Sequence, residues 1–207
     1  LSSSQLREIN GMPGVKGSSV DVEEKALLQD QDQQTVVLLK GVDSDYYKVS
    51  GVPQKMYHGH FNTGTTDAPQ LILGAGIESA IGIQADRNLS PITVFLPKKT
   101  NAQNPNPLSA LSVGNASSSG SFAIQQEFDN KYVITNLGFM KQQMNYQPDE
   151  YSALEIALIS PDKAETFKKS LQNVLGNKYK VLTKYEQNTS LYNSMRLEKW
   201  FIYAVLT

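Results

Sequence analysis

The sequence predicts a mixed α+β fold, because strand-forming runs alternate with short helical segments along its 207 residues. Dense β-branched and aliphatic stretches such as "TVVLLKGV" (35–42) indicate strands, while glycine and proline bound the helical segments. The texture of the chain changes near Gln70, and a new strand–helix pattern begins at Ser152. The length suffices for one large domain or two small ones.

The first half of the chain predicts a helix, a hairpin and a strand–helix–strand segment. A polar turn, "QDQDQQ" (29–34), joins the two strands of the hairpin. In order, we expect a helix at 2–9, strands at 15–28 and 33–42, helical turns at 43–51, a strand at 70–74, a helix at 75–82 and a strand at 91–97.

The second half begins with Pro97 to Ser121, whose Pro, Asn, Ser and Gly content predicts a long exposed loop. A β-α-β unit is expected from Ser152 onward. The expected elements are a strand at 121–128, a strand end and helix at 133–144, a strand at 152–159, a helix from its cap at Asp162 to Leu175, a strand at 178–183, and one helix from Tyr185 to Thr207, roughly 35 Å long.

The composition excludes some classes of protein. Nineteen Lys and Arg balance 20 Asp and Glu, which leaves no basic footprint for a nucleic-acid partner. The absence of cysteine excludes disulfides, thiol nucleophiles and Cys-ligated metals. The opening "LSSSQLREIN" does not resemble a signal peptide, and no interior apolar run approaches the length of about 20 residues that a membrane span needs.

No motif in the chain predicts catalysis, a cofactor site or a metal site. His58 and His60 would share one face of a strand, where a metal could bridge them, but no third ligand is in view, so we interpret them as partly exposed strand residues. "GAGIES" (74–79) lacks the third glycine of a dinucleotide site and is interpreted as a tight turn that lets a helix pack. Glu127 and Asp129 are interpreted as a solvated strand face.

The C-terminal segment has the pattern of a membrane interface. Arg196 and Lys199 precede an apolar run that contains Trp200 and Tyr203, and these residue types settle where bilayer and water meet. The run is too short to span a bilayer, so the alternative is an amphipathic helix docked on its own domain. Both ends of the sequence look cut from a longer chain, and we expect the sequence to be a fragment.

Four segments together resemble a known family: "LILGAGIESAIGI" (71–83) with "PITVFLP", "GSFAIQQEFDNKYVI" (120–134), "YSALEIALISPDKAETFKKSLQ" (151–172) and "LYNSMRLEKWFIYAVLT" (191–207). They look like the extracytoplasmic part of ABC-transporter permeases of the FtsX, MacB and LolC-LolE type. The resemblance covers most of the chain and lies in the order of its parts. Its most specific element is the segment Arg196-x-Glu198-Lys199, which in the family leads into the second transmembrane helix.

The resemblance implies two subdomains. A porter-like β-α-β part would be built from both ends, residues 1–65 and 151–190, with a strand-rich sabre-like part, residues 66–150, inserted between them. Residues 191–207 would start a transmembrane helix. Members of the family have no catalytic residues or cofactors here, since their ATPase is cytoplasmic and the periplasmic part transmits its cycle.

The predicted loop stands where lipoprotein-releasing members of the family carry a hook that engages a periplasmic carrier. The resemblance therefore makes six residues candidates for partner contact, although the loop lacks the Gly-Arg-x-x-Pro type core of that hook and is longer. These are Lys98, Lys99, Pro105, Pro107, Leu108 and Leu111. The alternative is a disordered surface loop.

Three functions follow as hypotheses. The first is the periplasmic domain of a bacterial inner-membrane ABC permease in lipoprotein release or export, whose partners would be a cytoplasmic ATPase subunit, a second permease copy or paralogue, and a periplasmic carrier or adaptor. The second is a MacB-like component of a tripartite efflux pump. The third, from another class, is a stand-alone soluble periplasmic binding domain or an enzyme domain.

Overall fold

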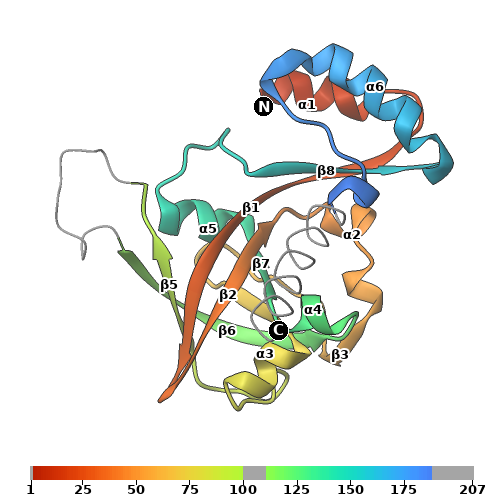
Figure 1. The fold of residues 1–207 in the computed structure, drawn as a ribbon. Helices are drawn as coiled ribbons and strands as arrows, with labels where there is room; N and C mark the ends of the chain where they lie inside the picture. The colour runs from red at the N-terminus through yellow and green to blue at the C-terminus, as the bar shows by residue number, and fades with distance from the viewer. Residues whose placement is uncertain (1, 100–110, 188–207) are drawn as a thin grey trace, which may run out of the picture. The chain divides into compact units, whose positions relative to one another are not determined.

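The computed structural model describes residues 2–99 and 111–187, and it has the predicted α+β fold. Six of its strands close into a mixed barrel, in the order β1-β2-β7-β4-β6-β5 and back to β1 (Figure 1). The barrel strands are β1 (Val15–Asp30), β2 (Gln33–Val42), β4 (Gln70–Gly74), β5 (Ile92–Pro97), β6 (Leu111–Phe122) and β7 (Tyr132–Asn136). Two more strands extend the sheet: β3 (Met56–Gly59) pairs with β6, and β8 (Ala153–Leu158) pairs with β1.

Strands β1 and β2 form the hairpin that the sequence predicts. They pair in antiparallel register from Asp21 opposite Val42 to Asp30 opposite Gln33, and Gln31 turns the chain with a φ of 49°. The β1 strand is 16 residues long, so its end also pairs with β5, where Leu27 stands opposite Phe95. This second pairing closes the barrel.

The helices are short and follow the strands. They are α1 (Ser3–Asn10), α2 (Tyr46–Val49), α3 (Ala75–Ala80), α4 (Gln126–Asp129), α5 (Leu137–Met144) and α6 (Ala164–Leu175), with 3-10 turns at Val52–Gln54, Pro161–Lys163 and Gly176–Lys178. Asn136 begins α5 as a cap, because its side-chain oxygen accepts hydrogen bonds from the amides of Gly138 and Phe139. The predicted helix at 2–9 and the strand end and helix at 133–144 are confirmed, and the helices predicted within 43–51 and 75–82 are present but shorter.

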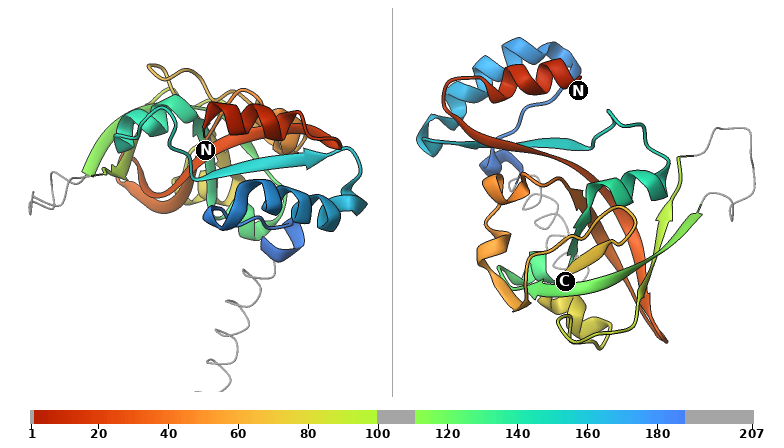
Figure 2. Two further views of the ribbon diagram at one scale, coloured as in Figure 1. Left: turned by 90° about the horizontal axis from the view of Figure 1, so that it is seen from above. Right: turned by 180° about the vertical axis from the view of Figure 1, so that it is seen from behind.

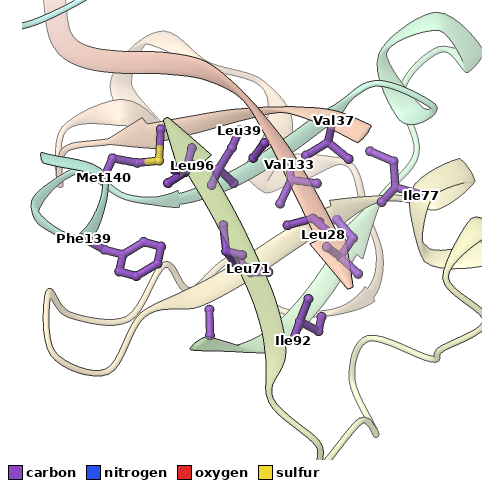
Figure 3. Close-up of a cluster of buried hydrophobic side chains, with 14 of the residues drawn as sticks. Leu28, Val37, Leu39, Leu71, Ile77, Ile92, Leu96, Val133, Phe139 and Met140 are labelled. Carbon is purple, nitrogen blue, oxygen red and sulfur yellow. The ribbon is translucent and has the colours of Figure 1, made fainter. Parts of the chain in front are cut away.

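The core lies on the inner faces of the strands, where α3 and α5 contribute apolar side chains (Figure 3). The labelled members are Leu28, Val37, Leu39, Leu71, Ile77, Ile92, Leu96, Val133, Phe139 and Met140. A second cluster uses the opposite faces of β4 and β7, through Ile72 and Ile134, and packs against Tyr46 and Val52. Packing is tight at Gly41, where an added Cβ would lie 2.4 Å from Cγ of Met140.

The chain divides into two units. One holds residues 1–10 and 16–157 and contains the barrel; the other holds residues 11–15 and 158–207, and its described part contains α6. The barrel joins two strands from residues 15–42, β1 and β2, to four strands from residues 70–136, β7, β4, β6 and β5. The division at residues 65 and 150 stays a prediction.

The prediction of a loop over residues 97–121 is wrong for its second half, because strand β6 begins at Leu111. The small residues there serve close packing, because a Cβ at Gly114 would lie 3.0 Å from the ring of Phe139. Ser112, Gly114 and Ala116 therefore face inward. The small residues that make this segment look like a loop in sequence are there because the packing leaves no room for larger ones.

Two further strands were predicted wrongly. The segment 121–128 ends β6 at Phe122 and turns into α4, where the carboxylate of Asp129 accepts a hydrogen bond from the amide of Ile124. Glu127 and Asp129 are thus helical. Residues 178–183 form no strand, because the side-chain amide of Gln172 binds the backbone here in place of a neighbouring strand. Its oxygen accepts a hydrogen bond from the amide of Val181, and its nitrogen donates to the carbonyls of Gly176 and Tyr179.

The N-cap predicted for α6 also differs from the one in the structure. Asp162 lies inside the 3-10 turn Pro161–Lys163, and α6 begins at Ala164 without a side-chain cap. The helix ends at Leu175, as predicted, before Gly176 with its φ of 64°. Of the helix expected from Tyr185 to Thr207, residues 185–187 are described; they are helical, and the helix begins one residue earlier than expected, at Lys184.

Candidate functional site

The end of β5 and the start of β6, here called the hairpin base, hold the described members of the predicted partner site. Pro97 and Leu111 stand opposite each other at the ends of the two strands, which lie side by side (Figure 2). Lys98 and Leu111 are exposed there. The other candidates, Pro105, Pro107 and Leu108, lie outside the described residues.

Lys99 is held in place by the barrel unit itself. Its amide donates to the carbonyl of Met144, its ammonium group pairs with Glu150, and the same group lies 5.7 Å from the ring centre of Tyr146. The hydrogen bond from Lys99 and that from the amide of Gln147 lower the pKa of Glu150. Both partners face solvent, so the pair stabilises little, and the role of Lys99 is to fix the hairpin base.

A row of apolar side chains crosses four strands next to this base. The strand registers place Val36 opposite Leu27, Leu27 opposite Phe95, and Phe95 opposite Val113. Directly opposed residues share one face of a sheet, and here it is the outer face, since Val36 is 67% and Val113 60% exposed. We call these four residues the outer apolar row.

The outer apolar row was missed by sequence reasoning. The alternation of "LSVGNAS" (111–117) signals a strand with one open face, but the row exists only through the pairing of four strands. Exposed apolar side chains gathered in this way are typical of an interaction surface. The row extends the surface that Leu111 begins.

A buried charge cluster fixes β8 to the barrel. Lys40 of β2 lies 3.1 Å from a carboxylate oxygen of Asp21 on β1 and also binds Glu155 of β8. Burial would lower the pKa of Lys40, but the two carboxylates outweigh it and raise the pKa. Burial raises the pKa of Asp21, and Lys40 opposes that shift in part.

The two histidines do not form a pair. Strand β3 ends at Gly59, whose φ of 64° turns the chain before His60, so the predicted common strand face does not exist. His58 binds Glu78 instead, with Nδ1 3.1 Å from Oε1, and Glu78 also accepts a hydrogen bond of 2.6 Å from the amide of Ala85. Among the described residues, no group of three or more His, Asp or Glu side chains could hold a metal ion.

The "GAGIES" turn serves packing, as interpreted from the sequence. An added Cβ at Gly74 would lie 2.1 Å from the carbonyl oxygen of Asp129. The turn therefore lets α3 approach the segment that holds α4 closely.

In the second unit, a capping box starts the helix that begins at Lys184. The amide of Thr183 donates to the carboxylate of Glu186, and the amide of Glu186 donates to the hydroxyl of Thr183. Glu186 also forms an ion pair with Lys168 of α6. These contacts anchor the first turn of the helix to α6.

The candidate membrane-interface residues, Arg196, Lys199, Trp200 and Tyr203, lie outside the described residues. Within residues 2–99 and 111–187, no helix has both the length and the apolar character needed to cross a bilayer. The placement of these four residues at an interface stays a prediction.

The fold is similar to that of two solved domains that lie outside the cytoplasm, one from an ABC-type transporter. The extracellular domain of the noncanonical ABC-type transporter YknZ from Gram-positive bacteria superposes with a TM-score of 0.58, covering 86% of each chain at 13% identity. The periplasmic region of MacB from Actinobacillus actinomycetemcomitans gives a TM-score of 0.56 at 14% identity, covering 84% of this chain and 72% of that one. No family model matches the sequence, and no curated protein matches it significantly.

We predict that Lys40→Met destabilises the barrel unit by about 3–5 kcal/mol, because it leaves the buried carboxylate of Asp21 without its cation. Urea unfolding measures the loss. The exposed Lys25→Met on β1 is the control and should change stability little. Adding Asp21→Asn to Lys40→Met should recover part of the loss; a double variant as unstable as the single one would contradict this explanation.

We predict that the capping box of Glu186 persists into acid. The hydrogen bond from Lys168, followed by that from the amide of Thr183, lowers the pKa of Glu186 from 4.5 to about 2. Because the folded pKa is lowered, the contact is complete above about pH 4.5 and is lost as pH falls through about 2. The amide NMR signal of Thr183 should titrate with that midpoint, and Lys168→Met should move the midpoint upward. A midpoint near 4.5 in the unchanged protein would refute the assignment.

Proposed function

We propose that this chain is the extracytoplasmic domain of an inner-membrane ABC permease of the MacB and FtsX type, which transmits a cytoplasmic ATPase cycle to an envelope substrate or partner. The observation that carries the proposal is the fold shared with the YknZ domain over 86% of both chains. The resemblance of the sequence segments points to the same class.

A domain can transmit a displacement only if its parts are rigid and are firmly joined to the segments that follow them in the chain. The barrel is closed, and the Lys40 cluster fixes β8, the strand that pairs with β1 outside the barrel. The helix that begins at Lys184 is anchored to α6 through Glu186. If that helix continues into a membrane span from residue 191 onward, a displacement of the span would reach α6 through this anchor.

The domain itself acts without catalysis in this proposal. The ATPase would lie in a separate cytoplasmic subunit or domain, and a second permease copy or paralogue would complete the transporter. Residues 1–65 with 151–190 would form the porter-like part and residues 66–150 the sabre-like part. The proposed location is the bacterial inner membrane, with this segment facing the periplasm.

For the cargo, we propose lipoprotein release or export first. The support is a surface suited to a carrier protein: exposed Lys98 and Leu111 at the hairpin base, continued by the outer apolar row. A MacB-like role in tripartite efflux is the second candidate, and the fold likeness to the periplasmic region of MacB favours it.

Coupling is tested in the full-length transporter with Lys168→Met and Glu186→Gln. Both variants break the anchor between α6 and the following helix. We expect ATP hydrolysis to persist while substrate release per ATP falls about tenfold, since the two processes become uncoupled. Lys169→Met removes a neighbouring exposed charge and should change neither. If release stays proportional to hydrolysis in all three variants, transmission through this anchor is refuted.

The cargo is tested with the double variant Leu111→Ser/Val113→Ser. Both side chains are exposed, so the barrel should fold, and the loss of two apolar anchors should weaken binding of a periplasmic lipoprotein carrier by about tenfold or more in a pull-down titration. Leu89→Ser, at a fully exposed site elsewhere, is the matched control. Unchanged carrier binding would remove the lipoprotein hypothesis and leave the efflux candidate.

A further inference from the structure

The tip of the β1–β2 hairpin and the end of α3 line a surface hollow of about 390 Å³ within the barrel unit. The hairpin contributes its polar turn, and α3 contributes its last residues with the two that follow. The lining residues are Asp30, Gln31, Asp32, Gln33, Ser79, Ala80, Ile81 and Gly82. No lysine, arginine or histidine is among them, so the hollow is acidic.

Asp30 is the unusual member of this lining. Its side chain is only 5% exposed, and its Oδ1 atom is fully buried without a hydrogen-bond partner. Within residues 2–99 and 111–187, no cation pairs with this carboxylate either. Burying an unpaired carboxylate is strongly unfavourable, and such groups in proteins are usually paired or bind a metal. The arrangement therefore indicates a missing positive partner.

Several of the residues that line the hollow with Asp30 carry oxygen atoms that can bind a cation. Asp32 brings a second carboxylate two residues along the turn, and Gln31 and Gln33 bring side-chain carbonyl oxygens. At the end of α3, the carbonyl of Ser79 accepts a hydrogen bond from the amide of Gly82, so the lining residues that add further main-chain carbonyls there are Ala80 and Ile81. Two carboxylates with neutral carbonyl oxygens suit a hard divalent cation.

We propose that the hollow binds one calcium ion between the hairpin tip and the end of α3. Calcium accepts six to eight oxygens in flexible geometry, whereas magnesium requires a near-ideal octahedron and loses its waters reluctantly, so an open hollow with two carboxylates suits calcium better. With two carboxylates, a dissociation constant of about 10⁻⁴–10⁻³ M is expected, the range of extracellular calcium modules. The proposal rests on the proposed function only for the compartment in which the ion is met.

Calcium binding is tested on the purified 207-residue chain by calorimetric titration and thermal unfolding with CaCl₂ or MgCl₂ at constant ionic strength. Calcium at ten times its dissociation constant should raise Tm by about 3–5 °C, and magnesium should raise it less. The isosteric Asp30→Asn should remove the calcium response and raise Tm without calcium, because the buried charge is gone. Asp32→Asn, at an exposed position, should weaken calcium binding about tenfold.

The matched control is Asp86→Asn, which removes an exposed charge outside the hollow and should keep the full calcium response. The proposal is overturned if the unchanged chain shows neither heat nor a Tm shift with calcium, or if Asp30→Asn or Asp32→Asn responds as strongly as Asp86→Asn. If Asp30→Asn fails to fold, Asp32→Asn decides the outcome. These measurements need no transporter, so their failure would leave the coupling experiment unaffected.

Discussion

The pairing of β1 with two barrel strands at once is the constraint on which the barrel depends. Strand β1 binds β2 along its second half and β5 near its end, and without the second pairing the sheet would have two open edges. Closure removes those edges, which otherwise invite pairing with other chains. It also sets the register that brings Leu27, Val36, Phe95 and Val113 into one row.

The buried charge cluster adds specificity to this frame more than stability. Replacing a buried ion pair by apolar residues is often neutral or stabilising, while removing one partner is strongly unfavourable. Lys40 has partners on both β1 and β8. If β1 or β8 shifted by one residue, Lys40 would lose one of its two carboxylate partners. The cluster therefore favours one register for β8.

The sequence predicted those elements whose own residues determine them. The hairpin, α3, α5 and the end of α6 follow from β-branched runs, caps and glycines that act locally. Strand β6 was missed because its small residues are selected by contact with Phe139, which comes 25 positions after Gly114 (139 − 114). The strand expected at 178–183 does not form, and the side-chain amide of Gln172, on the preceding helix, binds its backbone at Tyr179 and Val181.

The candidate sites show the same division. Lys98, Lys99 and Leu111 lie together at the hairpin base, and their contact with a partner stays a prediction. The ion pair of Lys99 with Glu150 and the outer apolar row could be found only from the strand pairings. Likewise, the acidic turn "QDQDQQ" is ordinary in sequence, and only the packing of α3 beside it buries Asp30. Under the proposed function, the residues that hold one rigid element to the next, such as Lys168 and Glu186, would carry that function.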